Sequence, residues 1–165
     1  PFRNRRLIDC MLEKAQAVSW HVFVVANDER YHQLGVPCYA DAIVSQGPMS
    51  GVYTALMHST TNKNLVLSCD MPLVPVEYLR TLAASAGEEE VLVTAHGEQW
   101  EPLCSVYDKN TMPYLQACLQ REEAGLIKAI RSLKYKELDA RAQPGYSPDW
   151  FYNINTKEDL QKVPY

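Results

Sequence analysis

One aspartate stands where a strongly apolar segment of the chain ends. Residues 64–70 read NLVLSCD, and the segment stops at Asp70 and the proline of the motif SCDMP. A carboxylate at the end of a buried strand can hold a divalent cation, and Mg²⁺ favours one or two carboxylates with phosphate oxygens and water. An acid before a turn can instead cap the loop that follows. The residues leave both roles open for Asp70, and they favour the cap for Asp41, which follows the short apolar stretch 36–39.

A turn rich in glycine could meet an anion. GPMSG supplies Gly47, Pro48 and Gly51 ahead of a helical stretch. Glycine lets backbone N–H groups approach a ligand closely, and the helix that follows offers its positive end. Many connections between strands and helices also contain Gly and Pro, so an ordinary structural turn is the alternative.

Two asparagines near the end of the chain form a third polar motif. In NINT, Asn153 and Asn155 are two residues apart and lie on one side of the segment if it is extended. Amides offer donors and acceptors, which suit the edge of a heterocycle such as a pterin. Thr156 and Asp159 also match a helix N-terminal cap, which explains the threonine but not the asparagines.

Other chemistries find little support. The four histidines and five cysteines show no metal-ligand spacing, and no nucleophile motif is present. The 16 basic and 20 acidic residues give a net charge of −4, which argues against nucleic acid as a partner, so a polyanionic substrate needs a metal ion or aimed N–H groups. No apolar run approaches the roughly 20 residues of a membrane span, and we expect a cytoplasmic protein. The basic cluster of Arg3, Arg5 and Arg6 is expected to be a solvated face, with a phosphate-facing edge as the alternative.

Alternating strands and helices must position these motifs. Apolar and β-branched runs predict strands, and residues spaced by three or four predict amphipathic helices. The pattern predicts one α/β domain, a three-layer sandwich whose mostly parallel central sheet carries helices on both faces. In such sheets, ligands bind beyond the carboxyl ends of the strands, so one rim can gather Asn27, Asp41 and Asp70. The expected strands are 21–27, 36–39, 64–70, 91–95, 102–107, 135–138 and one at the start of the tail FYNINTKEDLQKV. The expected helices are 7–18, 52–58, a stretch after Pro75, 112–119, 126–133 and a short one at the end.

Taken in order, the motifs resemble those of the molybdenum cofactor guanylyltransferases. The matching segments are VVAN, the strand that ends in Asp41, GPMSG, SCDMP, EPLCSVY and FYNINTKEDL. The resemblance covers nearly the whole chain and implies a Rossmann-like domain that binds GTP and Mg²⁺ on one half of a cleft and a pterin on the other. It implies that Asp70 is the catalytic residue and binds Mg²⁺ and the triphosphate. Asn27, Asp41, Gly47, Pro48 and Gly51 then belong to the GTP site, and Asn153 and Asn155 face molybdopterin.

The resemblance also implies a reaction and its partners. We expect residues 1–165 to form a single nucleotidyltransferase domain that lacks the family's first strand, its glycine-rich loop and the lysine after it. The expected reaction transfers GMP from GTP to the terminal phosphate of molybdopterin, with Mg²⁺ as cofactor and pyrophosphate as product. Molybdenum insertion proteins and apo-molybdoenzymes are the expected partners. The alternatives are a cytidylyl- or other nucleotidyltransferase of the same fold, and a catalytically dead module that binds the pterin.

Overall fold

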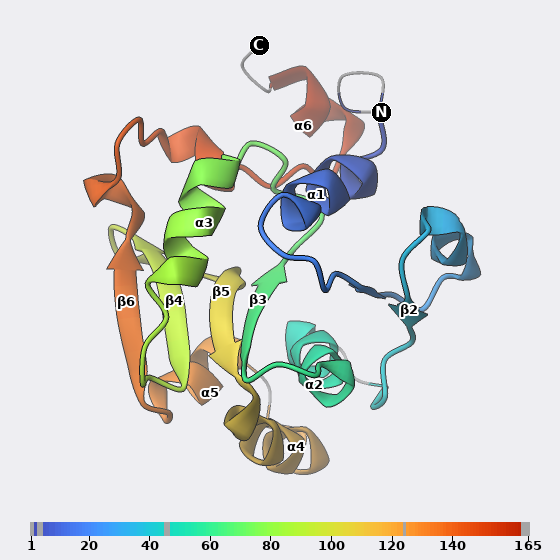
Figure 1. Ribbon diagram of the computed structural model, residues 1–165, viewed down its shortest axis with the longest axis vertical. Coiled ribbons are helices and arrows are strands. Elements are labelled where there is room, and N and C mark those ends of the chain that lie inside the picture. The colour runs from blue at the N-terminus through green and yellow to red at the C-terminus, as the bar shows by residue number, and fades with distance from the viewer. Residues whose placement is uncertain (1, 3–4, 45–46, 124, 163–165) are drawn as a thin grey trace.

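The computed structural model describes residues 2, 5–44, 47–123 and 125–162 as six strands, six α-helices and several 3-10 turns (Figure 1). The strands are β1 (Val24–Val25), β2 (Cys38–Tyr39), β3 (Lys63–Leu67), β4 (Val91–His96), β5 (Gln99–Asp108) and β6 (Tyr135–Asp139). The helices are α1 (Leu7–Gln16), α2 (Pro48–His58), α3 (Val76–Ala84), α4 (Met112–Gln120), α5 (Leu126–Arg131) and α6 (Lys157–Lys162). None of the helices in these ranges is long and apolar enough to cross a membrane.

The main sheet has the order β3-β5-β4-β6. β5 is antiparallel to β3 and to β4, and β4 is parallel to β6. Strands β3, β4 and β6 therefore share one direction, as expected for a mostly parallel sheet, and their carboxyl ends meet at one edge. β5 runs the other way because the two-residue turn of Gly97 and Glu98 joins it directly to β4. Gly97 has φ +72°, a conformation that glycine adopts without steric strain.

Helices cover both faces of this sheet and confirm the three layers. Side chains that alternate along β4 point to opposite faces, with Val91 and Val93 on one and Leu92 on the other. Helices α2, α4 and α5 pack against the first face. Helix α3 and the 3-10 turn Pro148–Phe151 pack against the second, and α3 crosses in front of β4 and β5 in Figure 1.

The first apolar segment departs from its prediction. Residues 21–27 were expected to be a strand covered on both faces, but only Val24 and Val25 are in β1, and both are half-buried. β1 pairs with β2 alone, in a separate parallel sheet of two strands, and no ladder in the described residues joins it to β3. The apolar side chains of this segment instead line one wall of an open groove.

A buried polar network ties α3 to the centre of the sheet. The hydroxyl of Tyr78 lies 2.8 Å from Thr94 Oγ1, and Thr94 Oγ1 donates to the carbonyl of Cys104 at 2.5 Å. All three residues are almost fully withdrawn from solvent. Burial raises the pKa of Tyr78, so the phenol stays neutral and its hydrogen bond persists at all ordinary pH values.

The Thr94→Val substitution is expected to lower the free energy of unfolding by about 1–3 kcal/mol, because it leaves a buried hydroxyl and a buried carbonyl without their partner. Urea denaturation measures the change. Thr94→Ser is the matched control, since it keeps the hydroxyl and should retain most of the stability. Equal stability in the wild type and Thr94→Val would show that the network contributes nothing.

Candidate functional site

Asn27 and Asp41 are held together by two hydrogen bonds. Asn27 Nδ2 donates to Asp41 Oδ2 at 2.9 Å, and the backbone N–H of Asp41 donates to Asn27 Oδ1 at 2.8 Å. The contact arises because β1 and β2 are parallel neighbours, with Val25 opposite Tyr39. Asn27 lies two positions after Val25, and Asp41 lies two positions after Tyr39. The rim predicted from the strand ends therefore brings this pair together.

The GPMSG turn is the first turn of α2, which begins at Pro48 rather than at Val52. Gly47 precedes the helix with φ +146°, a backbone conformation that residues with a Cβ rarely adopt. Pro48 suits the first helical position because its missing N–H would have had no partner there. The motif thus supplies the positive end of an eleven-residue helix.

Asp41 lies beside this helix with one oxygen unused. A Cβ placed on Gly51 would come within 3.9 Å of Asp41 Oδ1, so the glycine keeps the space next to that oxygen clear. Oδ1 is buried and accepts no hydrogen bond from the described residues. A buried acceptor without a donor is costly, and an N–H or O–H group of a ligand would satisfy it.

Asp70 follows β3 in a loop tied to the sheet. The backbone N–H of Ser68 donates to the carbonyl of Leu103 at 2.7 Å, and the hydroxyl of Ser68 donates to Asp70 Oδ1. A loop-capping role would require a backbone N–H that donates to the carboxylate of Asp70. Within residues 47–123, no backbone N–H does so.

The residues near Asp70 bear on which metal they could hold. The described residues contain no cluster of three or more acidic, histidine or cysteine side chains that could bind a metal. One carboxylate with a neighbouring hydroxyl is a sparse donor set. It fits a Mg²⁺ ion that brings phosphate oxygens and water as its other ligands, and it does not fit a metal held by the protein alone.

The asparagine motif lies against the Asp70 loop. The backbone N–H of Ile154 donates to the carbonyl of Asp70 at 2.8 Å. The strand expected at the start of this tail does not form, because residues 152–155 belong to no strand of the described structure. Ile154 is buried, while Asn153 and Asn155 on either side of it are exposed. Thr156 and Asp159 form the reciprocal cap of α6. The cap therefore explains the threonine and leaves the asparagines available on the surface.

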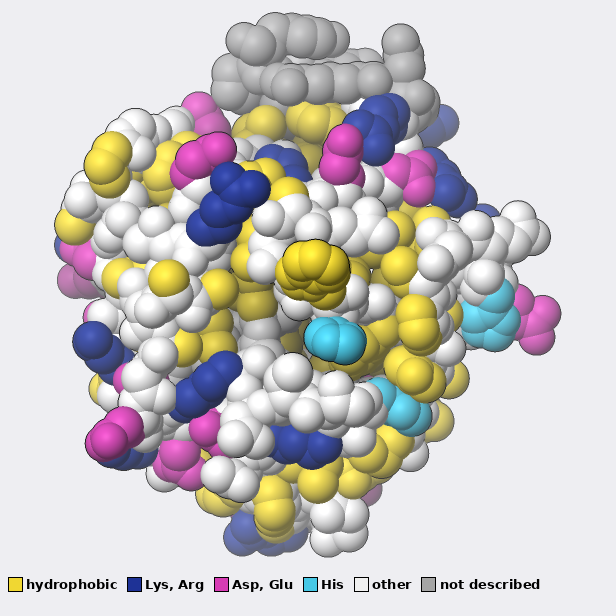
Figure 2. Space-filling view, in the orientation of Figure 1, with side chains coloured by type: hydrophobic (Ala, Val, Ile, Leu, Met, Phe, Trp, Pro, Cys, Tyr) yellow, Lys and Arg dark blue, Asp and Glu magenta, His cyan; other side chains and the backbone are white. Residues whose placement is uncertain are grey.

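A groove of about 650 Å³ separates β1 from β3. Its walls are mostly apolar, with contributions from α1 and α2, and Figure 2 shows this face of the molecule hollowed at its centre over hydrophobic side chains. Pro48 and Gly51 line it next to Asp41, and Ser68 and Cys69 line it next to Asp70. The Asn27–Asp41 pair and the Asp70 loop therefore border the same groove, although neither carboxylate is itself among the lining residues.

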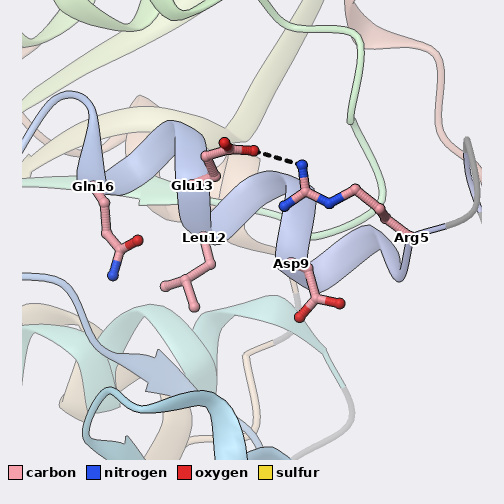
Figure 3. Close-up of a pocket in the computed structure, with 5 residues that line it drawn as sticks. All are labelled: Arg5, Asp9, Leu12, Glu13 and Gln16. Atoms are coloured by element: carbon pink, nitrogen blue, oxygen red, sulfur yellow. Dashed lines mark hydrogen bonds and ion pairs between the residues drawn. The ribbon is translucent and has the colours of Figure 1, made fainter.

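The basic cluster at the start of α1 carries little free charge. Arg6 pairs with Asp9 at 2.7 Å. Arg5 pairs with Glu13 at 2.7 Å beside a shallow depression on the helix surface, as Figure 3 shows. The hydrogen bond from Arg6 lowers the pKa of Asp9 and keeps that carboxylate ionised. These pairs favour the solvated face that the sequence predicted. Arg3 lies outside the described residues.

Sequence reasoning missed a pair at the turn between β4 and β5. His96 Nε2 lies 2.8 Å from Glu101 Oε1, and only 12% and 18% of the two side chains are exposed. The strand after this turn was expected to begin at residue 102, but β5 already begins at Gln99. Five-residue spacing across a tight glycine turn is the signal that could have predicted this contact across the hairpin.

Comparisons with known proteins show the family and the fold of the chain. A family model described as the MobA-like NTP transferase domain matches residues 1–138. The chain is similar to "Molybdenum cofactor guanylyltransferase" of Vibrio vulnificus, with 30% identity over 95% of this chain and 80% of that protein. It is also similar to "Probable molybdenum cofactor guanylyltransferase" of Carboxydothermus hydrogenoformans, with 28% identity over 99% of this chain and 84% of that protein. A crystal structure of an Aquifex aeolicus protein superposes with a TM-score of 0.81 at 26% identity, over 92% of this chain and 80% of that one.

Proposed function

The chain belongs to the family of MobA-like NTP transferase domains, and from that membership we propose that it transfers GMP from GTP to the terminal phosphate of molybdopterin. The observation that carries the proposal is the groove between β1 and β3. One of its walls leads to the Asn27–Asp41 pair and the N-terminus of α2, and the other leads to Asp70 and the asparagine segment. Two substrates can therefore approach one another from opposite walls.

The reaction needs little acid–base chemistry from the protein. A terminal phosphate oxygen of molybdopterin attacks the α-phosphorus of GTP, the bond from that phosphorus to the bridging oxygen of the β-phosphate breaks, and pyrophosphate leaves with the electron pair. A phosphate monoester has its second pKa at about 6, so the attacking oxygen is already ionised at neutral pH. The protein must instead hold two polyanions in line and offset their charge.

On this proposal the nucleotide occupies the wall formed by β1, β2 and α2. The unused oxygen of Asp41 accepts a hydrogen bond from the guanosine portion. Gly47, Pro48 and Gly51 let the nucleotide lie close to the start of α2, where no Cβ of Gly51 narrows the space beside Asp41. Asn27 Nδ2 fixes the rotamer of Asp41 by donating to Oδ2, and Asn27 Oδ1 accepts from the backbone N–H of Asp41.

Asp70 faces the reacting phosphates in this arrangement. We propose that it holds Mg²⁺, with the Ser68 hydroxyl fixing its carboxylate. The ion would supply positive charge to the phosphate oxygens and align them. Asn153 and Asn155 then present their amides to the pterin, at a distance from Asp70 that the Ile154 hydrogen bond fixes.

The proposal extends to the organisation of the domain and to its setting. We propose one nucleotidyltransferase domain over residues 1–165, in which the groove between β1 and β3 is open to the two substrates. A cytoplasmic location and transfer of the product to apo-molybdoenzymes, with help from molybdenum insertion proteins, complete the proposal.

Pyrophosphate release tests the function directly. With molybdopterin and Mg²⁺ present, GTP should support release at least about tenfold faster than ATP, CTP or UTP, and omission of molybdopterin should abolish it. Discrimination of this size corresponds to about 1.4 kcal/mol in the transition state, which one or two hydrogen bonds to the base can supply.

The other outcomes separate the alternatives. Preference for CTP would identify a cytidylyltransferase of the same fold. Binding of molybdopterin in isothermal titration, without Mg²⁺-dependent binding of GTP and without pyrophosphate, would identify a catalytically dead pterin-binding module.

A further inference from the structure

The His96–Glu101 pair lies at the same edge of the sheet as Asp70. β3 and β4 run in the same direction, so the end of β4 at His96 and the loop that begins after Leu67 meet at one rim. The pair is largely withdrawn from solvent, and the 2.8 Å contact between its members is the hydrogen bond that each side chain makes there. A carboxylate and an imidazole this poorly hydrated are held in fixed orientations.

A bulge in β5 fixes Glu101. The register between β4 and β5 shifts at Leu92 and Thr94. The hydroxyl of Ser105 fills the irregularity, accepting from the N–H of Thr94 at 3.2 Å and donating to the carbonyl of Glu101 at 2.7 Å. The phenol of Tyr107 donates to the carbonyl of Pro102 at 2.8 Å. The segment EPLCSVY is therefore a bulged strand whose own side chains hold the backbone of Glu101 in place.

His96 connects the bulged strand to the asparagine segment, residues 153–155, by contacting Phe151. Its ring stacks on the ring of Phe151, with centroids 4.6 Å apart and planes inclined by 23°. Phe151 is buried and precedes Asn153 by two residues, and the next residue, Ile154, is bonded to the carbonyl of Asp70. The asparagine segment is therefore fixed at one end by His96 and at the other by the Asp70 loop.

Two carboxylates lie near His96, and Glu101 is the one that bonds to it. Asp139, at the end of β6, is held by Arg141 at 2.8 Å, and the hydrogen bonds from Arg141 lower the pKa of that carboxyl. The Arg141 guanidinium also lies over the turn, 3.8 Å from where a Cβ on Gly97 would stand. Glu101 contacts His96 directly, and Asp139, which interacts with His96 electrostatically, is already paired with Arg141.

We propose that the His96–Glu101 pair is a positioning element for the acceptor substrate: through Phe151 it sets where Asn153 and Asn155 stand relative to Asp70. This inference rests on the proposed function, and it names which substrate the pair serves. A phosphorylated pterin needs its ring edge fixed so that its phosphate meets the nucleotide in line, and small displacements of the anchoring amides weaken that alignment. The nucleotide wall shares none of these contacts.

Steady-state kinetics with each substrate varied in turn tests the proposal. His96→Ala removes both the stack and the hydrogen bond, and it should raise KM for molybdopterin about tenfold while KM for GTP and kcat stay within about twofold. Glu101→Gln keeps an oxygen that can accept from the imidazole, so its KM for molybdopterin should rise by less than about threefold. Asp108→Asn is the matched control, because it removes the 3.0 Å pair with Lys63 at the opposite end of β5 and should change neither KM.

Amide hydrogen exchange gives a second measurement that needs no turnover. Residues 151–156 should exchange faster in His96→Ala than in the wild type, and at the wild-type rate in Asp108→Asn. Unchanged exchange in His96→Ala, or equal rises in KM for both substrates, would overturn the positioning role. A wild type that transfers no GMP would instead defeat the proposed function, and the exchange result would still decide whether His96 orders the segment. If His96→Ala does not fold, Glu101→Ala, which removes the acceptor and keeps the ring, takes its place with the same expected results.

Discussion

Replacing Asp70 with asparagine is expected to lower kcat for GMP transfer at least a hundredfold. The substitution keeps the shape of the side chain and an oxygen that the Ser68 hydroxyl can still reach, but it removes the negative charge proposed to hold Mg²⁺. Charge stabilisation at a transferring phosphoryl group is a large part of such catalysis, and loss of a single aimed group typically costs about 10²–10³ in kcat. Pyrophosphate release at saturating GTP and molybdopterin measures the effect.

The matched control is again an aspartate-to-asparagine change at the far end of the sheet. Asp108→Asn should leave kcat within about twofold of the wild type. The thermal midpoint of Asp70→Asn should stay close to that of the wild type, because Asp70 is only partly buried and pairs with a single hydroxyl. Turnover that is unchanged in Asp70→Asn would remove Asp70 from the reaction.

Replacing Asp41 with alanine is expected to raise KM for GTP between about tenfold and a hundredfold. The change deletes the buried oxygen that lacks a donor in the described residues, and hydrogen bonds to a charged group are worth about 1.5–3 kcal/mol. Each 1.4 kcal/mol is about tenfold in affinity. Isothermal titration with GTP and Mg²⁺, together with KM for both substrates, measures the change.

Asn27→Ala tests whether Asp41 binds GTP directly or only keeps the backbone after β2 in place. Asn27→Ala breaks both hydrogen bonds of the pair, one to the Asp41 carboxylate and one from the Asp41 backbone N–H, but it leaves the carboxylate in place. Its effect on KM for GTP should therefore be clearly smaller. KM for molybdopterin should not respond to either change, since the asparagine segment belongs to the other wall. A variant of Asp41 that loses affinity for molybdopterin instead of GTP would reverse the assignment of the two walls.

Much of the fold could be predicted from the sequence because local patterns determine it. The apolar run before Asp70 forms β3, and the three- and four-residue spacing from Leu7 onward forms α1. The hairpin between β4 and β5 could not be predicted in the same way, because its first residues are polar and a glycine with positive φ decides the turn. The segment 21–27 was misjudged for another reason: an apolar run has the same pattern whether a second sheet strand or an open groove lies beside it.

The candidate site shows the same division. Strand ends predicted that Asn27 and Asp41 would share a rim with Asp70, and β1 and β2 do bring the first two into contact. The bond from Ile154 to Asp70 joins residues 84 positions apart and depends on how the chain end packs, which no local pattern encodes. The His96–Glu101 pair escaped notice because the histidines were judged by metal-ligand spacing alone. Whether the gathered residues bind GTP, Mg²⁺ and molybdopterin stays a prediction.

The reversed direction of β5 has a consequence for how such a domain can diversify. Because this strand runs opposite to its neighbours, its beginning, and not its end, reaches the rim beside Asp70. One short turn therefore adds side chains to the half that we propose holds the acceptor, where His96 contacts Glu101 and Phe151. Residue exchanges or insertions at Gly97 and Glu98 could retune which acceptor is used and leave donor recognition intact, so the two specificities can change independently in evolution or by design.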